Sequence, residues 1–163
     1  MAAQPHRLPI LAAGLLALGG LASGHARAGD EWPPLLQRYC ERAFDAAQRI
    51  DMESFRDYDA EAFRAIHTDD AVTIFASGAW RVGIDAVMAA LASHFQDREA
   101  TWQWTELHRE VKGCVTAFIV YDTTYSIPSN GFRQRARVAV TYTFERGRWL
   151  SVLDQSTLLP ATP

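Results

Sequence analysis

Four long runs rich in β-branched and aromatic residues fill the second half of the chain, and they constrain its fold more than any other feature. They cover residues 101–111, 114–126, 132–145 and 148–157. Short stretches that contain Gly113, Gly131 and Gly147 separate the runs, and such turns are typical of antiparallel hairpins. The pattern therefore predicts an antiparallel meander of long strands.

The first half of the chain has a helical pattern instead. Residues 30–55 predict a long helix that begins near Pro33 and Pro34, and two more helices are expected at 59–66 and 83–96. The expected buried stripe of the long helix consists of Leu36, Cys40, Ala43, Ala47 and Ile50. Short strands are expected at 71–75 and 80–82. Helices followed by strands predict an α+β fold in which three N-terminal helices cover one face of a curved antiparallel sheet.

Residues 1–28 have the pattern of a secretory signal peptide. His6 and Arg7 provide a basic start, an apolar run follows, and Ala26-Arg27-Ala28 fits a signal peptidase site. The apolar run is shorter than the span of about 20 residues that a membrane helix needs. We therefore expect cleavage near Ala28, a single domain at 29–163, and a periplasmic or secreted product without a membrane span.

The charge and the cysteines exclude some functions. The formal net charge is −3, which argues against nucleic-acid binding because that function needs clustered positive charge. Cys40 and Cys114 permit one disulfide in an exported protein, and they equally fit two small buried side chains. Neither cysteine has a histidine at ligand spacing, so we expect no metal site, and we expect no other cofactor.

Arg133, Arg135 and Arg137 occur at every second position of one predicted strand, so they share one face of the sheet. The alternate face, which includes Val138 and Val140, is more apolar. The alternation alone does not decide whether the arginines point into water or into a pocket.

Two stretches resemble a known superfamily. "AEAFRAIHTDDAVTIFASGAWRVGIDAVMAAL" and "ARVAVTYTFERGRWLSVLDQSTLLP" are similar to the opening and the last two strands of SnoaL-like, nuclear transport factor 2-like domains. These include small bacterial domains of unknown function and the association domain of calcium/calmodulin-dependent kinase II. The resemblance covers about Leu35 to Pro160. It implies a cone-shaped sheet that encloses a pocket with the helices, and a homodimer formed through the outer sheet face.

The catalytic residues of the superfamily's ketosteroid isomerases do not match this chain. Tyr39 could be the tyrosine, but Asp69 is too distant in sequence, and the two acid positions correspond to Phe75 and Val140. In dehydratase relatives a His-Asp dyad is used, and the histidine position corresponds to the strand around Trp102, where no histidine is found. For His67, His94 and His108 we expect surface or helix-end positions.

The resemblance does suggest binding residues. Arg137 matches an arginine that we expect to face the pocket, with Arg135 nearer the rim, and either could bind a ligand's carboxylate. Trp102, Trp104 and Tyr121 could form apolar walls. Asp154 replaces a histidine of similar bacterial domains, and in a regular strand it would share a face with Leu150 and Val152. Burial could raise its pKa.

Three functions remain open at this point. The first is an exported protein that binds a small, partly apolar organic anion through Arg137. The second is an isomerase, cyclase or lyase with Asp154 or Tyr121 as the acid or base. The third is a dimerisation or assembly module whose sheet face carries the function.

Overall fold

The computed structural model describes residues 33–160, so the expected leader at 1–28 lies outside the described residues. The elements follow in the order α1 (Pro34–Arg56), α2 (Ala60–Ala65), β1 (His67–Ile74), β2 (Trp80–Val82), α3 (Ile84–Ala90), α4 (Ala92–Asp97), β3 (Thr101–Lys112), β4 (Thr116–Ile127), the 3-10 turn η1 (Pro128–Asn130), β5 (Phe132–Glu145) and β6 (Arg148–Leu158). The four long strands and the three expected helical regions are present, and the last of these regions is divided at Leu91 into α3 and α4.

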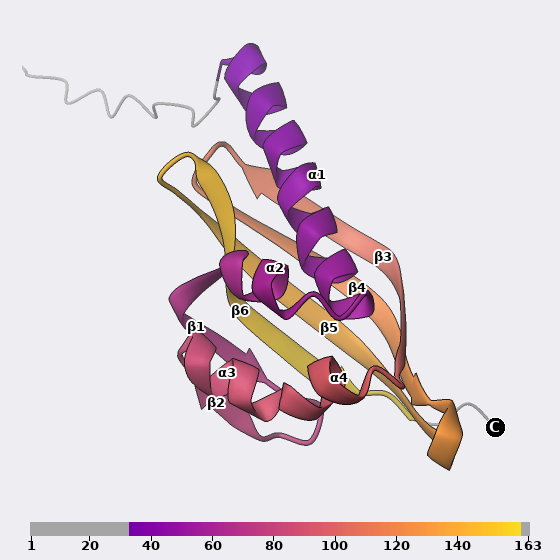
Figure 1. Cartoon of the computed structure of the whole chain (residues 1–163). Coiled ribbons are helices and arrows are strands. Elements are labelled where there is room, and N and C mark those ends of the chain that lie inside the picture. Colours follow the sequence, from indigo (N-terminus) through magenta and orange to yellow (C-terminus); the bar gives the residue numbers. More distant parts are fainter. Residues whose placement is uncertain (1–32, 161–163) are drawn as a thin grey trace, which may run out of the picture. The chain divides into compact units, whose positions relative to one another are not determined.

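The six strands form one sheet in the order β2-β1-β6-β5-β4-β3. The sheet is curved and does not close, and the helices lie on one of its sides (Figure 1). Strands β3 to β6 make the antiparallel meander predicted from the turn glycines. The expectation of a purely antiparallel sheet needs one correction, because β1 pairs in parallel with β6. The α+β fold class is confirmed.

Local signals explain where the helices begin. Pro33 is the N-cap of α1 and Pro34 its first residue, which suits proline because the first turn needs no N–H donor. The Asp59 side chain accepts a hydrogen bond from the Ala62 N–H at 2.9 Å and thereby caps α2. The predicted stripe on α1 is partly wrong, because Ile50 is 47% exposed. The buried residues of this helix are Cys40, Phe44, Ala47, Asp51, Met52 and Ser54.

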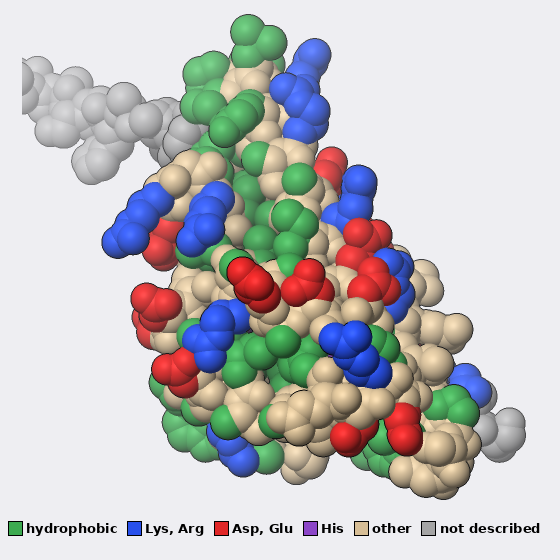
Figure 2. Space-filling view, in the orientation of Figure 1, with side chains coloured by type: hydrophobic (Ala, Val, Ile, Leu, Met, Phe, Trp, Pro, Cys, Tyr) green, Lys and Arg blue, Asp and Glu red, His purple; other side chains and the backbone are tan. Residues whose placement is uncertain are grey.

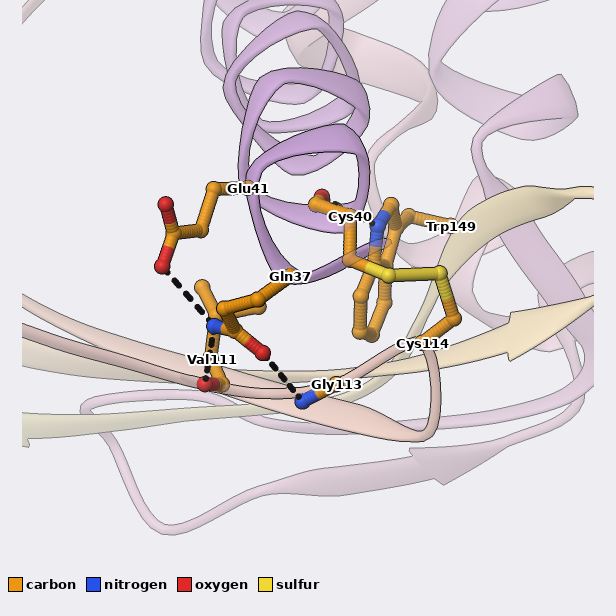
Figure 3. Close-up of a disulfide and its surroundings, with 7 residues drawn as sticks. All are labelled: Gln37, Cys40, Glu41, Val111, Gly113, Cys114 and Trp149. Carbon is orange, nitrogen blue, oxygen red and sulfur yellow. Dashed lines mark hydrogen bonds between the residues drawn. A yellow bond between two sulfur atoms is a disulfide. The ribbon is translucent and has the colours of Figure 1, made fainter. Parts of the chain in front are cut away.

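One end of the inner sheet face is filled by a packed cluster, which we call the closed end: Cys40, Phe44, Cys114, Tyr142 and Trp149. Phe44 makes edge contacts with the rings of Tyr142 and Trp149. Cys40 and Cys114 form a disulfide between α1 and the β3–β4 turn, and Trp149 Nε1 donates to the Cys40 carbonyl at 3.1 Å (Figure 3). The structure thus resolves the open question about the two cysteines.

Gln37 adds a second connection at the closed end (Figure 3). Its Nε2 donates to the Val111 carbonyl at 3.3 Å, and its Oε1 accepts from the Gly113 N–H at 3.2 Å. Gly113 has φ +55°, a left-handed conformation that glycine adopts without steric cost. The disulfide and the Gln37 amide therefore both hold the start of α1 to the β3–β4 turn.

On the surface shown in Figure 2, acidic and basic side chains are interspersed rather than gathered by sign. Exposed apolar side chains occur at the beginning of α1, where Leu35 and Tyr39 are 80% and 48% exposed. No helix within residues 33–160 is long and apolar enough to cross a membrane.

Candidate functional site

A cavity of about 590 Å³ lies at the other end of the inner sheet face, which we call the cavity end. Together with smaller apolar and polar residues, aromatic side chains from several elements contribute to its walls: Phe55, Phe63, Phe75, Trp102, Tyr125 and Phe132. The volume lies within the range of small-molecule sites in proteins, which are mostly apolar clefts with a few polar groups. The polar groups therefore decide what this cavity can bind.

The strand register determines which side chains reach the cavity. Thr123 pairs with Ala136 and Tyr125 pairs with Gln134, and all four line the cavity. Directly paired residues point to the same face of a sheet, and their neighbours in sequence point to the other face. The residues between them in β4 and β5 consequently face outward.

This register places the arginines outside. Arg135 and Arg137 alternate with the buried residues Ala136 and Val138, so both lie on the outer face, where they are 45% and 46% exposed. Arg135 binds the Asp122 carboxylate through two hydrogen bonds of 2.8 and 2.7 Å, and Arg137 approaches Asp122 at 3.5 Å. The hydrogen bonds from Arg135 lower the pKa of Asp122.

The expectation that Arg137 or Arg135 lines the cavity is therefore wrong. Arg133 is exposed as well. The more apolar face of β5 is the inner one, because it packs against the helices, and the arginines occupy the face with more access to water.

Asp154, in contrast, does line the cavity, and a β-bulge places it there. Thr141 pairs with Leu153 and Tyr142 pairs with Ser151, so Val152 is an extra residue without a partner in β5. Asp154 then pairs with Val140 on the inner face. The expectation that Asp154 shares a face with Leu150 and Val152 is wrong, because it assumes regular alternation through Val152.

A second carboxyl, Asp51 of α1, also lines the cavity. Tyr142 donates a hydrogen bond to Asp51 Oδ2 at 2.5 Å, and His67 Nε2 lies 4.0 Å from Asp51 Oδ1. His67 Nδ1 is 2.6 Å from the Phe63 carbonyl, an acceptor, so this nitrogen carries a proton. All three side chains are buried. Asp51 therefore has partners on two strands, β1 and β5.

Burial has a strong effect on both carboxyls. It raises the pKa of Asp154 to about 7, and the nearby Asp51 contributes to this rise while the Ser156 hydroxyl opposes it. Burial also raises the pKa of Asp51, against the opposing effects of His67 and Tyr142. Within residues 33–160, no lysine or arginine forms an ion pair with either carboxyl. A carboxyl with a pKa near 7 exists in both protonation states at neutral pH.

His94 lies beside the aromatic wall. Its ring stacks on Phe55 with centroids 3.9 Å apart, its Nε2 donates to the Phe55 carbonyl at 2.7 Å, and its Nδ1 accepts from the Tyr125 hydroxyl at 3.2 Å. Burial lowers the pKa of His94, which favours the neutral ring. His94 and His67 are both buried, so neither has a surface position, whereas the expected helix-end position holds for His94, which lies in the last turn of α4.

Of the three aromatic residues that were expected to form the pocket walls, only one does so. Trp102 lines the cavity, whereas Trp104 and Tyr121 do not. Trp104 lies under the Arg56 guanidinium, 5.6 Å from its ring centroid. Tyr121 is completely buried, and burial raises the pKa of its hydroxyl against the opposing effect of the Gln48 side chain. Tyr121 is therefore poorly placed to transfer a proton.

Sequence reasoning missed Asp51. The spacing of Cys40, Phe44, Ala47 and Asp51, four, three and four residues, is that of a buried helix face. An aspartate within this otherwise apolar stripe is the sequence signal that could have identified Asp51 as a buried functional residue. Among the described residues, no group of three or more histidines, cysteines, aspartates or glutamates is arranged to hold a metal ion.

The comparisons with known proteins identify the family. Residues 38–152 match the family model described as a SnoaL-like domain. The chain belongs to the SnoaL-like family. No curated protein matches this SnoaL-like chain by sequence.

Solved structures support the same fold. An uncharacterised protein with a cystatin-like fold from Caulobacter vibrioides has a TM-score of 0.63 and 15% identity, over 75% of this chain and 91% of that chain. A ketosteroid isomerase-like protein from Erwinia carotovora atroseptica has a TM-score of 0.62 and 16% identity, over 74% and 96%.

A putative calcium/calmodulin-dependent protein kinase type II association domain from Thiobacillus denitrificans has a TM-score of 0.61 and 19% identity, over 71% and 94%. At these identities the similarity establishes the fold alone, because one fold hosts many functions.

Proposed function

We propose that this SnoaL-like domain binds a small, largely apolar organic molecule in the cavity between its helices and the inner sheet face. The observation that carries the proposal is the cavity itself, about 590 Å³ with aromatic side chains in its walls, one buried carboxyl (Asp51) and one half-buried carboxyl (Asp154). Aromatic walls gain free energy by excluding water from an apolar ligand, and the few polar groups orient it. The organic anion expected from the sequence is not supported, because Arg137 lies on the outer face.

Binding can be tested with the purified protein and a matched pair of variants. Native mass spectrometry would reveal a co-purifying molecule, and a thermal-shift screen of small aromatic and alicyclic compounds would reveal others. Trp102→Ala removes a cavity wall, whereas Trp104→Ala removes the same side chain from a position outside the cavity. We expect ligand binding to be weakened only by the first. Equal binding by both variants, or no ligand for the wild type, contradicts the proposal.

A second candidate function is proton transfer by Asp154, which is favoured by the position of this carboxyl in the cavity wall, where burial raises its pKa to about 7. A general acid or base works best when its pKa is near the working pH. Deuterium exchange into enolisable ketones, followed by NMR, tests for it. We expect exchange to rise with pH around 7 in the wild type and to be lost in Asp154→Asn. Exchange that persists in this variant excludes Asp154.

We further propose export and dimer formation. The Cys40–Cys114 disulfide fits an oxidising compartment. If the leader is cleaved after Ala28, the protein in the periplasmic fraction of a Gram-negative host should have the intact mass of a chain that begins at Gly29. The dimer would use the outer sheet face, where Asp122 binds Arg135. Light scattering of the mature protein tests it, and a monomer would also exclude the assembly-module alternative.

A further inference from the structure

The buried and half-buried charges that face the cavity are of one sign, since Asp51 is buried and Asp154 is half-buried. Asp51 and Asp154 are carboxyls, and neither has a lysine or arginine partner within residues 33–160. Arg81 also lines the cavity, but this residue is exposed and its Nη1 donates to the Trp80 carbonyl at 2.8 Å. Water and salt screen an exposed charge much more than a buried one. His94 favours its neutral form because burial lowers its pKa.

The two carboxyls are not equivalent. Asp51 already accepts a hydrogen bond from Tyr142 and faces His67 at 4.0 Å. Asp154 is next to the Ser156 hydroxyl and has no cationic neighbour among the described residues. A buried carboxylate needs a compensating charge or hydrogen-bond donors. A cationic ligand would consequently stabilise the ionised form of Asp154 more than that of Asp51.

The walls suit a cation as well. Six aromatic side chains line the cavity: Phe55, Phe63, Phe75, Trp102, Tyr125 and Phe132. The faces of aromatic rings attract ammonium groups, and the attraction increases when water is excluded. Aromatic rings in the walls together with an uncompensated carboxyl favour a positively charged ligand over a negatively charged one.

We propose that the ligand is a protonated organic amine with a bulky apolar body, whose ammonium group pairs with Asp154 while the body lies between the aromatic walls. This inference rests on the proposed function and specifies its ligand class. It reverses the charge expected from the sequence, because an organic anion in this cavity would face two carboxyls and no buried cation.

The pairing implies a pH dependence with a defined sign. An alkylamine, with a pKa of about 10, stays protonated between pH 6 and 8. Asp154 must be ionised to pair with it, and the pKa of Asp154 in the empty cavity is about 7. Asp51 from α1 and Tyr142 from β5 interact electrostatically with Asp154, and His67 from β1 lies 4.0 Å from Asp51. The other titratable groups that line the cavity are Arg81, His94 and Tyr125. Affinity should rise by about tenfold from pH 6 to pH 8, as the ionised fraction of Asp154 rises.

Isothermal titration calorimetry with three matched probes tests the charge class. The probes are naphthylbutylamine, naphthylbutanol and naphthylbutanoate, which share one apolar body and differ in charge. We expect the amine to bind at least about tenfold more tightly than the alcohol at pH 8, and the carboxylate to bind most weakly. This comparison needs the wild type alone, so it remains decisive if a variant does not fold.

Asp154→Asn should remove most of the preference for the amine and the rise with pH. Asp122→Asn is the matched control, because it removes the same charge from the outer sheet face, and it should keep both. An alcohol or carboxylate that binds as tightly as the amine overturns the ligand class and leaves small-molecule binding intact. Failure of all three probes contradicts the proposed function together with the ligand class. A pH dependence retained by Asp154→Asn also overturns the assignment.

Discussion

The two ends of the inner sheet face differ in how their space is filled. At the closed end, Phe44, Tyr142 and Trp149 fill the interior, and a disulfide fixes α1 to the β3–β4 turn. At the cavity end, rings of similar size surround about 590 Å³ of space, with the buried Asp51 and the half-buried Asp154 in its walls. The packed side chains of the closed end thus stabilise the fold. The cavity end contributes less to stability, because it is less densely packed and contains polar groups whose burial costs free energy. Such a cost is expected where a protein binds or reacts.

Tyr142 lies at the boundary between the two ends. Its ring packs against Phe44, while its hydroxyl donates to Asp51 of the cavity. Burial and the adjacent Asp51 raise the pKa of this hydroxyl, so it remains a hydrogen-bond donor at neutral pH. The closed end therefore orients one of the two cavity carboxyls.

The largest expected effect is on stability at the closed end. Trp149 is 1% exposed, and Trp149→Ala would leave a cavity and remove the hydrogen bond to the Cys40 carbonyl. We expect a loss of about 3–5 kcal/mol in the free energy of unfolding. Urea denaturation measures it. Trp102→Ala at the cavity end is the control and should lose less than half as much, since Trp102 is only partly buried. Equal losses would mean that the two ends are packed alike.

The disulfide should be the next largest contribution. Its two cysteines are 74 residues apart, and closing a loop of that length stabilises a protein by about 2–4 kcal/mol. The double variant Cys40→Ala/Cys114→Ala should lose this amount and keep its ligand affinity, because the disulfide lies outside the cavity lining. Reduction of the wild type should have the same effect. A change in ligand affinity would show that the two ends are coupled.

Asp154 should have a pH-dependent effect on stability. Its folded pKa of about 7 is above the usual unfolded value of about 4, so the folded state holds the proton more tightly. The wild type should therefore lose stability as the pH rises from about 4 to 7, and Asp154→Asn should not share this loss. A difference of about three pKa units corresponds to about 4 kcal/mol, and water screens part of this effect because Asp154 is only half-buried. At pH 8 the variant should therefore be more stable by on the order of 2–3 kcal/mol. Denaturation at several pH values measures the difference, and parallel pH profiles would contradict it.

The smallest effect is expected on the outer face. Arg137→Ala removes a 3.5 Å contact with Asp122 that solvent screens, and Asp122 keeps its two hydrogen bonds to Arg135. We expect no measurable change in Tm or in ligand affinity. Thermal denaturation and titration of the same sample measure both quantities. A loss of affinity would restore Arg137 as a binding residue.

The sequence predicts the fold better than the site, and particular residues explain the difference. Turn glycines and long β-rich runs predict the meander because both signals are local. Alternation correctly groups Arg133, Arg135 and Arg137 on one face. It does not say which face is inside, because that depends on how the helices pack on the sheet.

Asp51 was missed for a related reason. Leu36 and Ile50 shifted the expected helix stripe away from Phe44, and the helix faces the sheet through Phe44 and Asp51 instead. Asp154 was identified from the resemblance, but its orientation depends on an unpaired residue that no local pattern predicts. Backbone geometry and packing between distant elements decided these positions.

The unpaired Val152 also affects how this strand can be compared with those of relatives. A sequence alignment that runs without a gap through β6 matches residues by their position along the chain. One extra residue, however, moves every side chain after it to the opposite face of the sheet. Relatives without the extra residue need a one-position gap here before Asp154 is matched to a side chain that projects inward. A gapless alignment would match it to outward residues and assign the wrong chemistry to the family's interior.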